Sequence, residues 1–373
     1  MNPQEIFCPN IECPARGQVN AGNIKSHSLK EKRYGCEVCQ QTFAATKGTI
    51  FYRLKTDAQV VMVVITLLVY GCPVQAIVAA YGFDERTVKS WWRRAGVHCQ
   101  QVHQQVVGQS QLDLGQVQAD EIKVKTQAGT LWLAMAIMVS SRLWLGGVIS
   151  PRRDKQLIQA LADQIRAVAL CRPLLLAVDG LSSYIRAFQR AFRSKVPRGG
   201  RAGRSRLYAW PQVAIGQVVK ARTAGCLTID RRIAQGSKQM IERLIQVSQG
   251  IGVINTAFIE RLNATFRQRL VSLARRTRAL ARQPETLQAG MYVLGCVYNF
   301  CTYHQSLRVP LYLSHRRRRW LQRTPAIVAG LTDHPWSILE LFLFKVPPSP
   351  WTPPKRRGRP SKVTLRLIQQ WCH

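Results

Sequence analysis

Three acidic residues stand where carboxylates can do chemistry: Asp120, Asp179 and Glu260. Asp120 lies in an alternating, strand-like run, Asp179 ends an apolar run, and Glu260 begins "ERLNATFRQRL" with no basic residue three or four positions away. An ionised carboxylate beside an apolar core is costly unless it is paired or bound to a metal. Three carboxylates without basic partners are expected to bind two divalent cations through oxygen ligands. Two such metals clamp a phosphodiester for in-line displacement.

The first two acids leave alternatives open. Side chains alternate along a strand, so Asp120 and its neighbour Glu121 are expected on opposite faces, and only one of them can face Asp179. We choose Asp120, which shares a face with Ile122 and Val124. Asp179 also begins an Asp-Gly dipeptide, which is common in turns.

The third acid has a rival. Glu242 lies in "MIERLI", a segment similar to the one around Glu260. Lys238 precedes Glu242 by four residues, so an ordinary helical ion pair explains that acid. Arg267 and Arg269, two turns after Glu260, are expected to hold DNA phosphates beside the metals.

The elements that must position these acids form a mixed sheet. Runs at 116–126, 131–141 and 142–150 alternate like strands, and their short connections predict an antiparallel meander. A helix is expected over 154–170, then a fully apolar strand that ends at Asp179, then another helix. This order describes a ribonuclease H-like mixed-sheet catalytic core, which we place at 110–310.

Four cysteines near the start have metal-ligand spacing. Cys8 and Cys13 form one pair and Cys36 and Cys39 another, and two such pairs can bring four thiolates around a structural Zn²⁺. The alternative is two reduced pairs without metal. The spacing predicts a zinc ribbon at 1–45, a segment so poor in large apolar side chains that it needs the metal to fold.

Residues 46–100 predict a helix-turn-helix DNA-binding domain. An apolar helix up to Tyr70 and a short second helix lead to a glycine turn, and Asp84 can cap a third helix that begins at Glu85. Val88, Trp92 and Ala95 fall on one face of that helix, and Arg86, Lys89 and Arg93 fall on the other, as expected of a helix that enters the major groove. A plain three-helix bundle with a solvated basic face is the alternative.

The composition favours a nucleic-acid partner. Among 373 residues, 54 are Lys or Arg and 19 are Asp or Glu, for a formal charge of +35. Such an excess calls for a polyanion, either nucleic acid or an anionic membrane surface. The longest apolar run is too short to span a bilayer, and the isolated cysteines suit a reducing compartment. We therefore expect a cytoplasmic, nucleoid-associated protein with no membrane partner.

The carboxyl-terminal part is basic. We expect a basic helical extension at 311–344, followed at 345–373 by a proline-rich linker and a flexible basic tail. Within the tail, Arg357, Gly358 and Arg359 form an AT-hook-like core, in which an extended Arg-Gly-Arg lies in the minor groove. An unstructured tail that binds DNA non-specifically is the alternative.

These motifs together resemble bacterial insertion-sequence transposases of the IS-one family, a branch of the DDE transposases. The resemblance covers about residues 5–310 and includes the cysteine pairs, the helix-turn-helix, "ADEI", "VDGLSSY" and "FIERLNATFRQRLVSLARRTRAL". The last block is the most specific, since Glu260, Arg261, Asn263, Arg267, Arg269 and the "ARRT" that holds Arg275 and Arg276 match the family pattern in order.

The resemblance implies a chemistry and a set of ligands. It implies Mg²⁺- or Mn²⁺-dependent cleavage at the ends of a mobile element, then attack of the freed 3′-hydroxyl on target DNA. Asp120, Asp179 and Glu260 would be the catalytic metal ligands, and the zinc ribbon and helix-turn-helix would read terminal inverted repeats. A homodimer or larger synaptic complex would handle two ends together. The insertion between Asp179 and Glu260 is longer than in compact members of that family.

Two other functions fit parts of the sequence. A DNA-binding regulator with an inactive core would share the recognition half, but it has no reason to keep three carboxylates in a cation-rich chain. A junction-resolving nuclease would share the metal site, but it needs no helix-turn-helix to read sequence.

Overall fold

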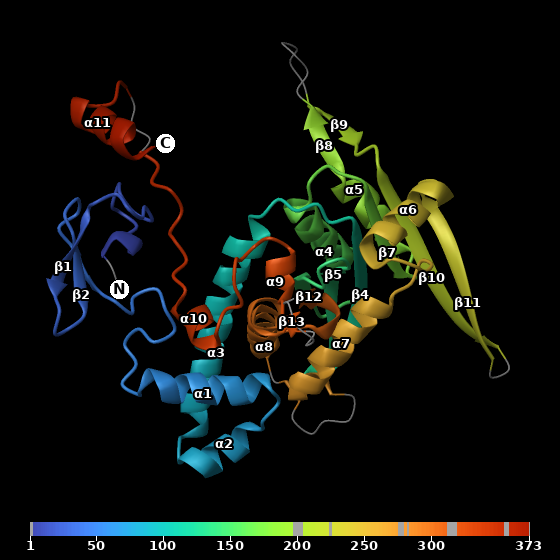
Figure 1. The fold of residues 1–373 in the computed structure, drawn as a ribbon, viewed down its shortest axis with the longest axis horizontal. Coiled ribbons are helices and arrows are strands. Elements are labelled where there is room, and N and C mark those ends of the chain that lie inside the picture. The colour runs from blue at the N-terminus through green and yellow to red at the C-terminus, as the bar shows by residue number, and fades with distance from the viewer. Residues whose placement is uncertain are drawn as a thin grey trace. The chain divides into compact units, whose positions relative to one another are not determined.

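The described chain forms two compact units. The computed structural model describes residues 3–196, 204–223, 226–274, 280–281, 283–311, 319–353 and 358–372. One unit joins Met1–Val60 to Phe342–His373, and the other is Val61–Leu341. Figure 1 shows the elements of both units along the chain. The five-segment domain layout given above stays a prediction.

A six-stranded mixed sheet forms the centre of the larger unit. Its strand order is β11-β10-β7-β4-β5-β6. The strands are β4 (Gln116–Thr126), β5 (Gly129–Met138), β6 (Trp144–Ser150), β7 (Leu174–Asp179), β10 (Val213–Thr223) and β11 (Cys226–Gln235). The predicted antiparallel meander β4-β5-β6 is confirmed, and β7 pairs in parallel with both β4 and β10. The β10-β11 hairpin was not predicted.

The pairing between β4 and β7 ends where the candidate acids lie. The parallel ladder between β4 and β7 ends at the pair Ala119–Val178. Asp120 follows directly on β4, and Asp179 is the last residue of β7. Beyond this point β4 has no β7 residue beside it, so the side chains there project past a strand end.

Helices cover both faces of the sheet. They are α4 (Lys155–Val168), α5 (Ser183–Ala191), α6 (Lys238–Gln249) and α7 (Ala257–Arg269). Asp154 caps α4 by accepting from the amides of Gln156 and Leu157, and the expected stripe of α4 is buried. Side chains of α6 and α7 contact the face of β4 that carries Gln116, Gln118 and Asp120.

Three helices precede the sheet, as predicted. They are α1 (Ala58–Val69), α2 (Val74–Tyr81) and α3 (Glu85–His103), with a left-handed Gly82 between the last two and the Asp84 side chain accepting from the Arg86 amide. Of the three apolar residues expected on one face of α3, Val88 and Ala95 are buried and Trp92 is half-buried. Trp91 is also buried, and Phe83 packs edge-on against it.

The third helix is longer than a short recognition helix. It continues through a π-helical turn at Gln104–Gly108 and packs along α8 (Pro284–Cys296), itself followed by a π-helical turn at Val297–Cys301. A Cβ added at Gly96 would lie 2.3 Å from that of Ala289, so a glycine is needed for the two helices to touch. The second half of α3 is therefore built into the same core as the sheet.

The rest of the larger unit consists of short elements. β8 (Arg193–Val196) pairs antiparallel with β9 (Arg206–Ala209), and β12 (Val309–Leu311) pairs antiparallel with β13 (Arg319–Leu321). Short helical segments are Val271–Leu273, Gln305–Leu307 and α9 (Pro325–Val328), and the larger unit ends within α10 (Ile338–Leu343). Of the extension expected to be helical over 311–344, residues 312–318 lie outside the described residues. The described part begins with the antiparallel pair of β12 and β13, and Arg308 lies over the Trp320 ring at 4.0 Å.

The smaller unit is a three-stranded sheet with a helix packed on it. After a turn at Pro3–Glu5 come β1 (Ile24–Ser28), β2 (Arg33–Cys36) and β3 (Thr42–Ala44), paired in that order. The expectation of a flexible tail is wrong for its last part, because α11 (Lys362–Trp371) buries Trp371 in the same core as Cys8 and Cys36.

Among the described residues, no helix combines the length and the apolar character needed to cross a lipid bilayer.

Candidate functional site

All three predicted acids line one pocket of about 480 Å³. Asp120 comes from β4, Asp179 from the end of β7 and Glu260 from the first turn of α7. Two cations, Arg153 and Lys220, line the same pocket. The fold thus brings together residues that are up to 140 positions apart in the sequence.

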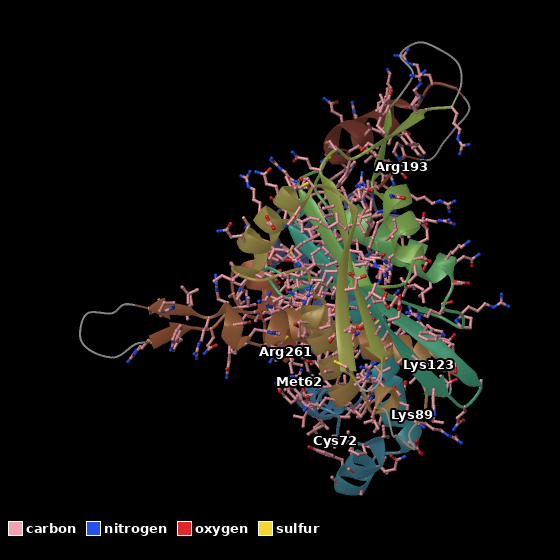
Figure 2. All side chains as sticks on the ribbon, turned by 90° about the vertical axis from the view of Figure 1, so that its right-hand side faces the viewer. Met62, Cys72, Lys89, Lys123, Arg193 and Arg261 are labelled. Atoms are coloured by element: carbon pink, nitrogen blue, oxygen red, sulfur yellow. The ribbon has the colours of Figure 1, made fainter. Side chains whose placement is uncertain are left out.

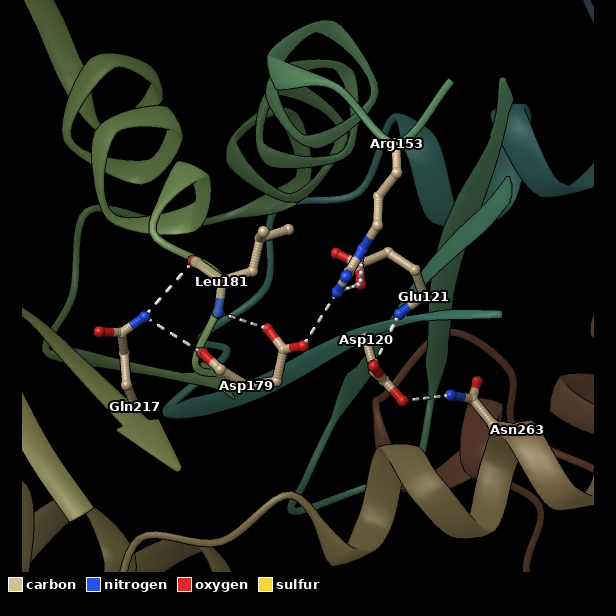
Figure 3. Close-up of polar contacts among 7 residues, drawn as sticks. All are labelled: Asp120, Glu121, Arg153, Asp179, Leu181, Gln217 and Asn263. Carbon is tan, nitrogen blue, oxygen red and sulfur yellow. Dashed lines mark hydrogen bonds and ion pairs between the residues drawn. The ribbon is translucent and has the colours of Figure 1, made fainter. Parts of the chain in front are cut away.

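Asp120 is held by two hydrogen bonds. Its Oδ1 accepts from the amide of Glu121 at 2.8 Å, and its Oδ2 accepts from Nδ2 of Asn263 in α7, also at 2.8 Å (Figure 3). Burial and the nearby charges of Asp179 and Glu260 raise the pKa of Asp120, and the two hydrogen bonds only partly oppose them. A carboxylate in this state gains from a nearby cation.

Asp179 and Glu121 share one guanidinium. Nη2 of Arg153 lies 2.8 Å from Oε2 of Glu121 and 3.2 Å from Oδ2 of Asp179 (Figure 3). The other oxygen of Asp179 accepts from the amide of Leu181 at 3.0 Å. Burial raises the pKa of Glu121, while Tyr184 of α5 and Arg153 oppose this shift.

The expectation that only one of Asp120 and Glu121 approaches Asp179 is wrong. Single oxygens of Asp120, Glu121 and Asp179 all lie within 4.8 Å of one another. The two side chains leave β4 on opposite faces, but a neighbouring strand keeps them apart only where it lies between them, and the pairing of β4 with β7 ends at Ala119. Glu121 can therefore reach past the end of β7 from the opposite face.

These oxygens fit a hard divalent cation. Oxygens on opposite sides of an octahedral Mg²⁺ lie about 4.2 Å apart when each bond is about 2.1 Å. Single oxygens of Asp120, Glu121 and Asp179 lie up to 4.8 Å apart, slightly wider than this value. Glu260 is not in that group, but it lines the pocket that Asp120 and Asp179 also line.

Glu260 does have a basic partner, contrary to expectation. Its Oε1 pairs with Nζ of Lys220 in β10 and accepts from Oγ1 of Thr256 at 2.6 Å. Burial opposes ionisation, but the bonds from Lys220 and Thr256 outweigh it and lower the pKa of Glu260. The partner was missed because it comes from another strand, 40 positions away, rather than from the same helix.

The rival acid lies elsewhere. Glu242 does not line the pocket of the three acids, and its carboxylate lies 3.9 Å from Lys238, the helical neighbour predicted from the sequence. The geometry thus favours Glu260.

The four predicted cysteines also come together. Sγ of Cys8 lies 3.7 Å from that of Cys39, and Sγ of Cys13 lies 3.8 Å from that of Cys36. The edge of a sulfur tetrahedron around Zn²⁺ is about 3.8 Å for bonds of about 2.3 Å. Burial raises the pKa of the Cys8 thiol to about 12, a cost that a bound metal removes because thiolates are its ligands. The cluster fits structural zinc.

The structure describes some of the residues predicted to contact DNA. Arg86, Lys89 and Arg93 are exposed on α3, with Lys89 paired to Glu85. Figure 2 labels Lys89, Arg193 and Arg261 among the many side chains that end in nitrogen atoms.

Of the other residues predicted to contact DNA, some lie within the described part of the chain and some lie outside it. Arg269 lies over the Tyr70 ring at 4.6 Å, and Arg267 is half-buried on the same helix. Gly358 has a φ of 94°, and both Gly358 and Arg359 are exposed. Arg275, Arg276 and Arg357 lie outside the described residues.

Two comparisons with known proteins give no identification of the family. A comparison with models of known protein families finds no match, and a search of curated proteins finds no significant match either. The function is therefore inferred from the residues and their geometry.

Proposed function

We propose that this chain is a DNA transposase that binds the ends of a mobile element, cleaves them in a metal-dependent reaction and joins them to target DNA. The observation that carries the proposal is the meeting of Asp120, Asp179 and Glu260 in one pocket beside two cations. Acids on adjacent central strands and a facing helix suit two-metal phosphodiester chemistry.

The ribonuclease H-like core is part of the proposal. It is supported by the strand order, in which the first strand of an antiparallel meander is flanked by a parallel strand and then by a second one. This arrangement places β4 and β7 side by side at the centre, where both can present an acid.

The catalytic cofactor would be Mg²⁺ or Mn²⁺, held by Asp120, Asp179 and Glu260. When bound, such an ion activates the attacking oxygen and stabilises the leaving one. Glu121 does not line the pocket and is held by Arg153, so its role in the proposal is to fix Arg153 beside Asp179.

The cations of the pocket have a second role in this proposal. Lys220 and Arg153 partly neutralise the acids in the free protein. Once cations bind the carboxylates, these two side chains can turn to the phosphates of the DNA, which the formal charge of +35 attracts over the whole molecule.

DNA recognition would come from the amino-terminal part. Arg86, Lys89 and Arg93 are exposed on α3, as a groove-reading helix requires. The zinc module would add further contacts to the terminal inverted repeats. Two ends must be cut together, so the active form is proposed to be a homodimer or a larger assembly.

Strand transfer tests the proposal. Purified protein is mixed with labelled DNA that carries the two flanks of its coding sequence, with a supercoiled plasmid, and with Mg²⁺ or Mn²⁺. We expect metal-dependent joining by the wild type and by Glu242→Gln, and none by Glu260→Gln, although all three bind the labelled DNA.

Each other outcome contradicts a part of the proposal. Binding without cleavage by the wild type would indicate a DNA-binding regulator with an inactive core. Cleavage without joining would indicate a junction-resolving nuclease. Joining that survives in Glu260→Gln but not in Glu242→Gln would show that the third acid is wrong.

A further inference from the structure

A buried glutamine in the central strand holds the amino terminus of the helix that carries Glu260. Gln118 of β4 is fully buried. Its Oε1 accepts from the backbone amides of Phe258 and Ile259 at 2.9 and 3.0 Å. Its Nε2 donates to the carbonyl of Asn255 at 2.8 Å. Both ends of this side-chain amide therefore bind the start of α7.

These bonds replace a normal helix cap. The first amides of a helix have no partner within it, and a threonine at the N-cap usually accepts from one of them. Thr256 is the N-cap residue of α7, but its hydroxyl donates to Glu260 at 2.6 Å and makes no cap bond. Asn255 accepts from the amide of Ala257 at 3.1 Å, and Gln118 serves the next two amides.

The same strand contacts α7 a second time. Two residues after Gln118, Asp120 accepts from Asn263, which lies four residues after Ile259. Two residues of strand advance about 6.6 Å, and four residues of helix advance about 6 Å. The two contacts therefore match in spacing and fix α7 along β4, with Glu260 between them.

We propose that Gln118 is a positioning residue of the catalytic site: by capping α7 from the sheet, it leaves the Thr256 hydroxyl free to orient Glu260 and sets the height of Glu260 against Asp120. This inference rests on the proposed function, because it concerns the metal centre of that function. It adds a residue that touches neither metal nor DNA.

The chain offers a matched control. Gln116 lies on the same face of the same strand and is also fully buried, but its Oε1 accepts from Oγ of Ser248 in α6, at 2.5 Å. Methionine is similar in size to glutamine, so Gln→Met at either position removes the buried amide and keeps the volume of the side chain. Only the change at 118 releases the helix that carries Glu260.

The test compares Gln118→Met with Gln116→Met in the full-length, zinc-loaded protein. Hydrogen exchange reports the cap, and calorimetric titration with Mn²⁺ reports the site. We expect exchange at the Phe258 and Ile259 amides to rise about tenfold or more in Gln118→Met only. We also expect its Kd for Mn²⁺ to rise about tenfold or more, as for lost supports of metal ligands. Gln116→Met should match the wild type in both.

A milder pair covers the case in which a Met variant does not fold. Gln118→Asn and Gln116→Asn keep the amide but shorten the side chain by one methylene, and the same differences are expected. The role of Gln118 would be overturned if the variants at 118 and 116 bound Mn²⁺ with equal affinity. If Asp120→Asn no longer bound Mn²⁺ while the wild type did, the proposed metal centre would still be supported. Absence of Mn²⁺ binding in the wild type would overturn both.

Discussion

Nδ2 of Asn263 donates a hydrogen bond of 2.8 Å to Oδ2 of Asp120 and so ties α7 to β4 across 143 positions of sequence. This bond and the cap from Gln118 place Glu260 over the open end of the β4-β7 ladder. The acids are thus held by neutral amides on one side and by the cations Arg153 and Lys220 on the other.

Asp120→Asn should stabilise the metal-free site at neutral pH. Burial, then the charges of Asp179 and Glu260, raise the pKa of Asp120 above its ordinary 3.8 in the folded chain. Ionisation therefore favours the unfolded chain, and the wild type loses stability as the pH rises from 3.8 through the raised pKa. The asparagine does not ionise, so its advantage in Tm should be smallest at the lowest pH and should grow as the pH rises from 3.8 through the raised pKa.

Thermal unfolding from pH 4 to pH 8, without and with added Mg²⁺, checks this expectation. Mg²⁺ should raise the Tm of the wild type by binding the folded state, and should raise that of Asp120→Asn much less. A variant less stable than the wild type at pH 7 without Mg²⁺ would contradict the account of Asp120.

Arg153→Ala should destabilise the fold through Glu121. The side chain of Glu121 is only 1 % exposed, and removal of Arg153 leaves its charge buried without its cation. We expect a loss of about 3 kcal/mol in the free energy of unfolding, the usual result of breaking a buried pair from one side. Arg152→Ala, at the exposed neighbouring position, is the control and should change little.

A double-mutant cycle separates this effect from loss of packing. Glu121→Gln removes the stranded charge, so Arg153→Ala should cost much less in that background. Denaturant unfolding of the four proteins measures the coupling. If the two changes lowered the free energy of unfolding additively, Arg153 would act through its packing over Trp132 instead. Its guanidinium carbon lies 5.2 Å from the centre of that ring.

Loss of zinc should release the carboxyl-terminal helix as well as the ribbon. Trp371 of α11 packs in the core that contains Cys8, Cys13 and Cys36. A cysteine change at 36 should therefore expose Trp371 and open both 5–45 and 362–371 to protease, while the sheet of the larger unit stays folded.

The measurement is limited proteolysis with mass spectrometry of Cys36→Ser, with Cys171→Ser as control because that cysteine is exposed. The difference in emission between each variant and its Trp371→Phe derivative reports the tryptophan itself. Protection of both segments in Cys36→Ser, at the level of the control, would reject the structural role of zinc.

Arg86→Ala and Arg93→Ala should weaken DNA binding with a characteristic salt dependence. Each is exposed on α3, and loss of one phosphate contact lowers the slope of log K against log salt by about 0.9. Lys89→Ala should have a smaller effect because Lys89 already pairs with Glu85.

Fluorescence anisotropy at several salt concentrations gives these slopes. Arg190→Ala removes the same charge from an exposed position on α5 and serves as the control. Equal losses for Arg190→Ala and Arg86→Ala would mean that binding follows net charge and not the α3 surface.

Sequence patterns were sufficient for the elements that carry the acids. The alternation over 116–126, the apolar strand before Asp179 and the helix around Glu260 are all present as expected. Each of these signals is local, because periodicity reports which face of an element is buried.

Contacts between distant elements could not be read in the same way. The pairing of Glu260 with Lys220 depends on the β10-β11 hairpin, and the bonds of Gln118 reach a helix some 140 positions away. The approach of Glu121 to Asp179 depends on where the β4-β7 ladder stops. Strand register and strand ends decide these contacts, and one sequence does not reveal them.

The most direct test of the central claim is to map the metal site by cleavage of the chain. Fe²⁺ takes the place of Mg²⁺ in the zinc-loaded protein, and ascorbate with peroxide then generates hydroxyl radicals that cut the backbone beside the bound iron. We expect cuts close to 120, 179 and 260, which should be absent in Asp120→Asn and suppressed by excess Mg²⁺. Cuts near 242 in place of 260, or no Mg²⁺-sensitive cuts, would contradict the central claim.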